Sequence, residues 1–266
     1  MVIGVNHLLD CVETNAPTTK HDIEELLRLQ RTKTSPTKTD DTSSTVLAHL
    51  IIDVDTALEH LYGGYHSDWL AGGEWSHMYS YLQSLLKSCQ DLSLCLIFCF
   101  DGTLYRHGHS QWYYEQTQQR KKVNQIFKHL KQNRPGSPCR HAWLAPTAFQ
   151  LCFRVILREL NSPHLIMHQT WGYGPCEHQQ QVKRLALHYR TSLLGIVSSD
   201  IEFLFASRID DRPILLNNFS SKHFKLAVKG KWNLVPIRWE QLPDRFSLDN
   251  ASFALLLALL GTAFYF

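Results

Sequence analysis

The sequence lacks the motifs that would assign a common chemistry at once. It contains no Cys-x-x-Cys pair, no His-Glu-x-x-His run, no Gly-x-x-x-x-Gly-Lys loop and no Gly-x-Gly-x-x-Gly loop. These absences argue against a zinc site and a nucleotide-binding loop. Net charge is also small, because 27 Lys and Arg face 24 Asp and Glu, giving +3. Any attraction to nucleic acid must therefore come from a local basic patch.

Cysteine usage and the chain ends predict the compartment. Seven cysteines form an odd set, and several lie inside apolar runs such as "LCLIFCF" (94–100), which is typical of buried thiols in a reducing compartment. The opening "MVIGVNHLLDCVE" places polar side chains where a signal peptide is apolar. The apolar end, "SFALLLALLGTAFYF", is shorter than the roughly 20 residues of a membrane span. We expect an intracellular protein that enters no membrane.

Alternating apolar patterns predict an α/β fold. Continuous apolar runs, typical of buried strands, alternate along the chain with apolar positions at helical spacing. This alternation predicts a mostly parallel central sheet flanked by helices, in a single domain over residues 1–266. Residues 31–45, "RTKTSPTKTDDTSST", predict a flexible loop, and the turns after residue 203 an antiparallel edge. The expected strands are 50–52, 92–100, 164–168 and 193–197, and the expected helices cover 75–89, 149–160 and 182–189.

Three of the predicted strands deliver an acid at their carboxyl end. Asp53 follows "HLII", Asp101 follows "LSLCLIFCF", and Asp200 follows "LLGIV" and two serines, with Glu202 two residues later. In a parallel sheet these ends lie along one edge, so we expect the acids to converge. Converging carboxylates suit Mg²⁺ or Mn²⁺, and two such ions hydrolyse phosphodiesters. The alternative is that each aspartate only caps the helix that follows.

The order of the motifs resembles a known family. "IGVNHLLDCVETNAP" (3–17), "IIDVD", "FCFDG" and "VSSDIE" are similar to segments of flap-endonuclease and XPG-type nucleases, which have a PIN-like fold. "DVDTALEHLYGGYHSDWLAGGEW" and "AWLAPTAFQLCFRVIL" resemble the branch of constitutive coactivator of PPAR-gamma-like proteins, relatives of Asteroid. "FDGTL" (100–104) also resembles part of a haloacid-dehalogenase-type phosphatase signature, but Cys99 stands where that family has its nucleophile.

The resemblance implies a site and also departures from it. It implies metal-binding roles for Asp53, Asp101 and Asp200. The catalytic candidates that it implies are Asp53, Asp101, Glu177, Asp200 and Glu202. Active nucleases have two acids one residue apart before the last motif, whereas this sequence has Glu177 and then His178 and glutamines. They also have an aspartate two residues after the Gly of "LLG" and then a helix-two-turn-helix element, and both are absent after Gly261. We expect Asp55 to cap a helix or support the site.

A basic, aromatic stretch at 102–140 predicts a binding surface. Its cations have a single acid, Glu115, among them, and Tyr and Trp side chains are interleaved. Cations for phosphates and rings for base stacking are what single-stranded nucleic acids require. The family resemblance makes this segment an arch over the active site; the alternative is a solvated helix whose aromatics pack inward. The candidate binding residues are Arg106, Trp112, Arg120, Lys121, Lys122, Lys128 and Lys131.

Two functions follow from these patterns. The first is a non-catalytic module that binds RNA or another single-stranded nucleic acid and protein partners, with a degenerate acidic site; by resemblance it works as a pseudo-nuclease linked to transcription. The second is a nuclease that depends on Mg²⁺ or Mn²⁺. We expect the first, and a location in the nucleus rather than the cytoplasm.

Overall fold

The computed structural model describes a little over half of the chain. Of the sequence-based predictions, those on the loop 31–45, on Asp55, on Arg106, and on Asp200 and Glu202 lie outside this part. The segment around "LLG" near residue 261 also lies outside it. The described residues are 21–24, 27–28, 47–54, 56–57, 75–102, 109–131, 149–172, 175–198, 224, 226–234, 243, 246–249, 251–253 and 255.

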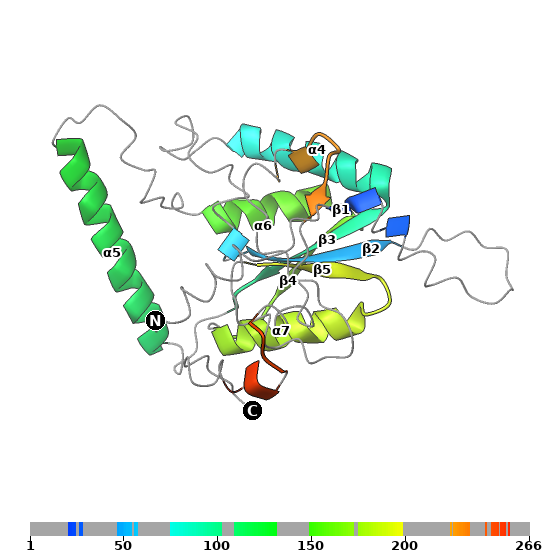
Figure 1. Cartoon of the computed structure of the whole chain (residues 1–266). Coiled ribbons are helices and arrows are strands. Elements are labelled where there is room, and N and C mark those ends of the chain that lie inside the picture. Colours follow the sequence, from blue (N-terminus) through cyan, green and yellow to red (C-terminus); the bar gives the residue numbers. More distant parts are fainter. Residues whose placement is uncertain are drawn as a thin grey trace, which may run out of the picture.

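A four-stranded parallel sheet forms the centre of the molecule (Figure 1). Its spatial order is β4-β3-β2-β5, and each neighbouring pair is parallel. Parallel neighbours joined through helices confirm the predicted α/β class with a parallel central sheet. The strands are β2 (Ala48–Asp53), β3 (Leu94–Phe100), β4 (Leu165–Gln169) and β5 (Leu193–Val197), within two residues of the expected positions.

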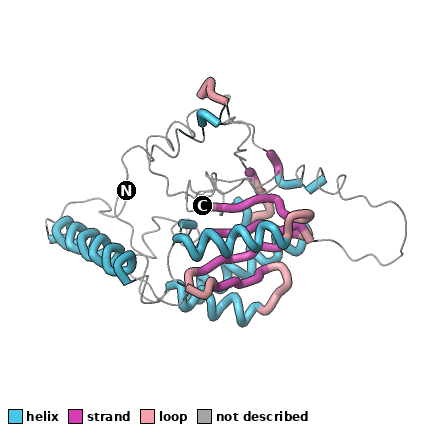
Figure 2. The backbone as a smooth tube through the Cα atoms, turned by 90° about the horizontal axis from the view of Figure 1, so that it is seen from below, coloured by secondary structure: helices cyan, strands magenta, loops and turns pink. Residues whose placement is uncertain are grey.

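Helices cover both faces of the sheet. Figure 1 shows α4 (Trp75–Leu92) and α6 (Phe149–Leu160) on one face and α7 (Pro175–His188) on the other. The same layers are seen from below in Figure 2. Because both faces are covered, the inner strand β3 is apolar throughout, and all seven of its residues are buried. The carboxyl ends of the strands and the first turn of α7 are thereby placed at one edge.

Aromatic rings join α6 to the sheet. The Phe153 ring lies edge-on to Phe98, with centroids 5.2 Å apart, and 5.9 Å from Phe100. Phe98 and Phe100 are two residues apart in β3, so their side chains point to the same face. Phe153 follows Phe149 by four residues and therefore shares a face of the helix with it. The helical spacing seen in the sequence thus becomes the face that α6 buries.

Most of the segment after residue 203, where an antiparallel edge was expected, lies outside the described residues. Among the described residues, the antiparallel pair is β1 (His21–Asp22) with β6 (Asn233–Leu234), which form a separate two-stranded sheet. The turn before β6 was predicted correctly, and Gly230 has a φ of 77° there, a conformation that favours glycine. The partner strand β1 could not be predicted, because turn signals locate a strand but not the strand with which it pairs.

The buried indole of Trp232 attaches this second sheet to the main body. Its Nε1 donates a hydrogen bond of 2.9 Å to Ser88 Oγ in α4. The Trp232 carbonyl also accepts from the Ile23 backbone amide at 3.1 Å. Segments more than 200 residues apart in the sequence are therefore hydrogen-bonded to each other, and Trp232 links them to α4.

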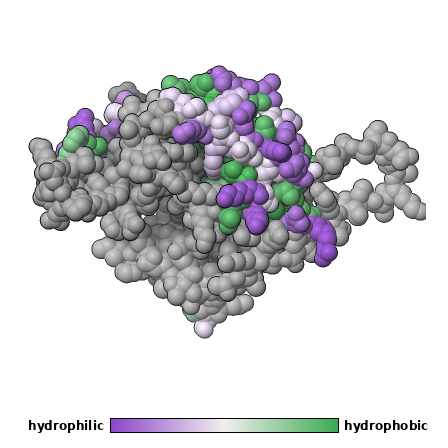
Figure 3. Space-filling model, turned by 90° about the horizontal axis from the view of Figure 1, so that it is seen from above, coloured by the Kyte–Doolittle hydropathy of each residue, from purple (hydrophilic) through white to green (hydrophobic). Residues whose placement is uncertain are grey.

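Helix α5 (His109–Lys131) stands apart from the layered body in both views (Figures 1 and 2). In the space-filling view from above, small hydrophobic areas are interspersed with hydrophilic ones over the described residues (Figure 3). No helix in the described part of the chain has the length and hydropathy that crossing a membrane requires.

Candidate functional site

Two of the predicted acids meet at the carboxyl edge of the sheet. Asp53 is the last residue of β2, and Asp101 directly follows β3. These two strands are parallel neighbours in which Asp53 pairs with Cys99, so both aspartates leave the sheet at the same edge. Asp53 is 1% exposed. The structure therefore places a buried carboxylate beside a second one, an arrangement that requires a positive partner.

That partner is the imidazole of His178, in the first turn of α7. Its Nε2 lies 3.0 Å from Asp53 Oδ1 and its Nδ1 lies 3.0 Å from Asp101 Oδ1. The contact with Asp53 is a hydrogen bond, whereas the one with Asp101 has ion-pair distance but poor hydrogen-bond alignment. One buried ring thus lies between the two aspartates and contacts both.

The second oxygen of Asp53 is also engaged. Ser198, which follows β5, donates a hydrogen bond of 2.6 Å to Asp53 Oδ2. Thr56 donates another of 2.8 Å to the same oxygen, and its hydroxyl lies 3.0 Å from that of Ser198. Both carboxylate oxygens of Asp53 are therefore hydrogen-bonded to side chains.

The electrostatics of the three groups are coupled. Burial by itself lowers the pKa of His178, but the contacts with Asp101 and Asp53 and their negative charges outweigh burial and raise that pKa to about 10. Burial likewise tends to raise the pKa of Asp53, yet the hydrogen bonds from His178, Ser198 and Thr56 and the imidazolium charge lower it. At neutral pH the ring is a cation and Asp53 an anion.

Backbone contacts hold Asp101 in place. The Arg154 guanidinium of α6 donates to the Asp101 carbonyl at 3.1 Å and lies over the Phe100 ring, 4.7 Å from its centroid. Gly102 donates from its amide to the Gly172 carbonyl at 3.1 Å. A side chain at position 102 would overlap the backbone of Thr170, so the close approach requires glycine here.

This arrangement does not fit a divalent cation between the two aspartates. A Mg²⁺ ion needs carboxylate oxygens at about 2.0–2.1 Å, and the facing oxygens contact the ring nitrogens of His178 instead. Within the described ranges, no group of three or more His, Cys, Asp or Glu side chains is arranged to hold a metal ion. The metal-binding roles expected of Asp53, Asp101 and Asp200 stay a prediction, because Asp200 lies outside those ranges.

Glu177, the candidate acid on α7, does not point towards Asp53 and Asp101. Glu177 is exposed, and its neighbour His178 is the residue that turns inward. In the sequence, His178 stands out as a departure from the nuclease pattern, and that pattern assigns it no role. A partial signal was available, because two acids at one sheet edge need a counter-charge and His178 lies in the first turn of the helix before the last predicted strand. The pattern does not say in which direction the ring points.

A second candidate surface lies on α5. Tyr113 is 70% exposed and Phe127 is 57% exposed, and neither ring packs inward as the alternative interpretation expected. Of the predicted binding residues, the Arg106 site and the Lys131 side chain lie outside what is described. The others are exposed on this helix: Trp112, Arg120, Lys121, Lys122 and Lys128.

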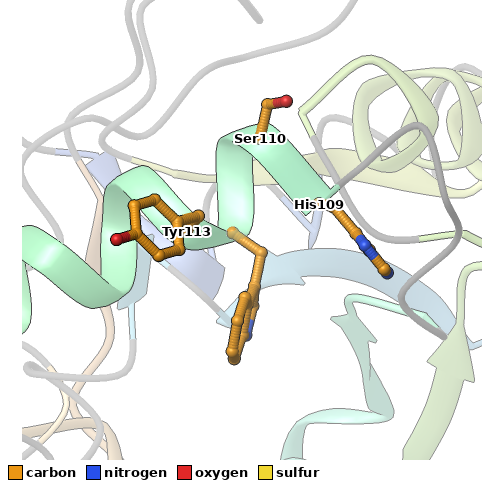
Figure 4. Close-up of a pocket in the computed structure, with 4 residues that line it drawn as sticks. His109, Ser110 and Tyr113 are labelled. Atoms are coloured by element: carbon orange, nitrogen blue, oxygen red, sulfur yellow. The ribbon is translucent and has the colours of Figure 1, made fainter.

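An open surface pocket adjoins the start of α5. Its volume is about 450 Å³, and its described lining consists of His109, Ser110, Trp112 and Tyr113. The close-up shows that His109, Ser110 and Tyr113 project from the first turns of the helix in different directions (Figure 4). The pocket offers rings and a hydroxyl, and its described lining does not include Asp53, Asp101 or His178.

Comparison with known proteins adds relatives over most of the chain. The constitutive coactivator of PPAR-gamma-like protein 1 of Homo sapiens is 27% identical over 214 residues, which cover 80% of this chain and 18% of the relative. The PPAR-gamma-like protein 2 of Homo sapiens is 27% identical over 220 residues. This chain is similar to the constitutive coactivator of PPAR-gamma-like proteins. The match confirms the resemblance that the motifs predicted, and the chain spans about a fifth of those relatives' length.

Other comparisons say less. The constitutive coactivator of peroxisome proliferator-activated receptor gamma of Bos taurus is 24% identical over 212 residues, covering 80% of this chain and 27% of that one. No protein-family model matches the chain. A structure of the catalytic core of Rad2 with a DNA substrate aligns with 79% of this chain and 54% of that one, at 13% identity. Its TM-score is 0.38, which is too low to support an argument.

Proposed function

We propose that this protein is a non-catalytic module that binds single-stranded nucleic acid, RNA in particular, and protein partners on a nuclease-like, PIN-like fold with a degenerate acidic site. The observation that carries the proposal is the exposed helix α5, on which aromatic rings and cations face solvent together. The names of the relatives, which call them coactivators, support the protein-interaction part.

The side-chain chemistry of α5 suits a single strand better than a duplex. Lys and Arg attract phosphates without regard to sequence, and exposed rings stack on unpaired bases. Tyr113 and Trp112 lie near one end of the helix, and Lys121 and Lys122 about two turns further on. A single-stranded nucleic acid that runs along the helix from its first turn would contact the aromatic rings first and the cations next.

Support for a degenerate site comes from the acids. The ring of His178 already pairs with Asp53 and Asp101, and catalysis by two metal ions needs acids free to coordinate them. Glu177 is exposed on α7 and adds no described contact to the pair. The carboxylates that coordinate metal ions in active nucleases here contact the ring of His178 instead.

Binding is tested by fluorescence anisotropy with labelled single-stranded RNA and DNA over a range of salt concentrations. The double variant Lys121→Glu/Lys122→Glu is expected to weaken binding and to reduce the slope of log affinity against log salt by roughly 1.4, about 0.7 per phosphate contact. The matched control is Lys229→Glu/Lys231→Glu, which makes the same charge change at an exposed turn. An equal loss in both variants would refute a specific role for α5.

Base stacking has its own variant. Tyr113→Ala is expected to cost about 1–3 kcal/mol of binding free energy, the range for one stacked base. Asn124→Ala on the same helix, where the side chain is exposed and not aromatic, should leave the affinity unchanged. Unchanged binding in the Tyr113 variant would remove stacking on this ring from the proposal.

The second candidate function is a nuclease that depends on Mg²⁺ or Mn²⁺, held by Asp53, Asp101 and Asp200. The observation in its favour is that Asp53 and Asp101 lie at one sheet edge. Cleavage of single-stranded RNA, single-stranded DNA and flap DNA by the parent, abolished in both Asp53→Ala and Asp101→Ala, would establish it and contradict the non-catalytic proposal.

A nuclear location belongs to the same proposal. It rests on the names of the relatives, which are coactivators. Imaging of the tagged chain would test it, and exclusion from the nucleus would contradict it.

A further inference from the structure

The ring of His178 fills the position that a cation would need between two carboxylates. Each ring nitrogen lies 3.0 Å from one carboxylate oxygen, Nε2 from Asp53 and Nδ1 from Asp101. His178 is 5% exposed and Asp53 is 1% exposed, so the contact is shielded from solvent. An ion could reach the facing oxygens only after the ring had moved away.

The other groups around the two aspartates also leave little room for a metal ion to coordinate them. Asp53 Oδ2 accepts hydrogen bonds from Ser198 and Thr56, which reach it from β5 and from the residues after β2. The positively charged Arg154 lies on the Asp101 side and binds its carbonyl. A divalent ion entering here would meet positive charge on two sides and would have to break existing hydrogen bonds.

We propose that the His178 side chain, whose two ring nitrogens face both carboxylates, occupies the position of a metal ion and keeps divalent metal ions out of the Asp53–Asp101 pair. Removal of this one ring opens a binding position for Mn²⁺ or Mg²⁺ between the carboxylates, because their negative charge is then uncompensated. The inference shares with the proposed function the idea of a non-catalytic acidic site, and it is independent of nucleic-acid binding by α5.

A purely structural role for the ring makes a different prediction. If His178 only filled space and satisfied Asp53, its loss would lower stability, and a divalent ion would restore nothing. If the ring occupies the position of a cation, a divalent ion restores the stability that the substitution removes. The two roles therefore differ in the response of the variant to metal.

The experiment measures Mn²⁺ binding by electron paramagnetic resonance and the midpoint of thermal unfolding with and without Mn²⁺, on the full chain. His178→Ala is compared with the parent and with His188→Ala, a control that removes an exposed histidine from the last turn of the same helix. The double variant His178→Ala/Asp53→Asn identifies ions bound elsewhere. Anisotropy with single-stranded RNA is recorded on the same samples.

The His178→Ala variant is expected to bind Mn²⁺ about tenfold or more tightly than the parent. Its midpoint of thermal unfolding should rise when Mn²⁺ is added. The His188→Ala control should behave as the parent. In the double variant His178→Ala/Asp53→Asn, the tighter Mn²⁺ binding and the rise in unfolding midpoint should both disappear. A parent that binds Mn²⁺ as tightly as His178→Ala, in a manner that depends on Asp53, would overturn the proposal.

A second variant covers a failure to fold. His178→Ser places a small polar residue near a helix start, where serine is tolerated, and both variants are also refolded in Mn²⁺. Recovery of folding by Mn²⁺ supports the proposal, because the ion replaces the lost charge. Folded variants without a metal response, or variants that Mn²⁺ does not recover, contradict it. Loss of RNA binding alone would contradict only the proposed function.

Discussion

At the scale of single residues, the central feature is a histidine, His178, whose ring contacts two aspartates. Its two ring nitrogens reach Asp53 and Asp101, which leave the sheet from neighbouring strands. The sequence predicted the aspartates because each follows an apolar strand. It could not predict the ring between them, because the direction in which residue 178 points depends on how α7 lies across the sheet.

The ion pair has a pH dependence whose sign follows from the shifted pKa of His178. Its pKa is raised from 6.5 to about 10 in the folded protein, so its stabilisation is complete below about pH 6.5 and is lost as the pH rises towards 10. Relative to a His178→Gln variant, the parent should lose up to about 1.4 kcal/mol of unfolding free energy per pH unit in this window.

Urea denaturation of both proteins from about pH 5.5 to about pH 9 measures this difference. His188→Gln, at an exposed position of the same helix, serves as the control and should follow the parent. Asp53, whose pKa is lowered, adds an opposite dependence only in acid, below its ordinary value of 3.8. A constant difference between parent and His178→Gln above pH 6.5 would refute the charged ring.

At the scale of elements, periodicity was informative where an element is buried. The helical spacing in α6 marked the face that carries Phe149 and Phe153, and the continuous apolar run of β3 marked a strand covered on both sides. It was less informative for α5. A mixed polar and aromatic helix is compatible with packing or with exposure, and the tertiary structure leaves its rings in solvent.

The contribution of the α6 face is testable by one substitution. Phe153→Ala removes a ring that contacts three other phenylalanines, and it should lower the free energy of unfolding by about 3–5 kcal/mol through lost burial and a cavity. Val155→Ala on the exposed side of the same helix should change it by no more than about 0.5 kcal/mol. Urea denaturation of both variants measures the contrast, and similar losses would contradict the assigned faces.

At the scale of the whole molecule, two segments far apart in the sequence meet beside α4, where Ile23 is hydrogen-bonded to Trp232. The small sheet of β1 and β6 lies outside the parallel sheet, and Trp232 links it to Ser88. Short strands of two residues carry little pattern, so their pairing was beyond sequence reasoning. Their described contacts include the β1–β6 pairing, a backbone hydrogen bond from Ile23 to Trp232, and the hydrogen bond of the buried indole to Ser88.

A double-mutant cycle measures that link. Trp232→Phe keeps most of the buried ring and removes the donor, and Ser88→Ala removes the acceptor. The interaction energy between the two sites should be about 0.5–1.5 kcal/mol, the usual value of one neutral hydrogen bond. Chemical denaturation of the parent, both single variants and the double variant gives this energy; additive effects would show that the contact contributes nothing.

The sequence by itself determined the α/β class, the order of strands and helices and the edge where Asp53 and Asp101 emerge. Those features follow from local apolar patterns and from the rule that parallel strands end together. Only the tertiary structure decided that His178 lies between the aspartates, that the rings of α5 face solvent and that β6 pairs with β1. Each of these depends on contacts between residues distant in the sequence, which no local pattern specifies.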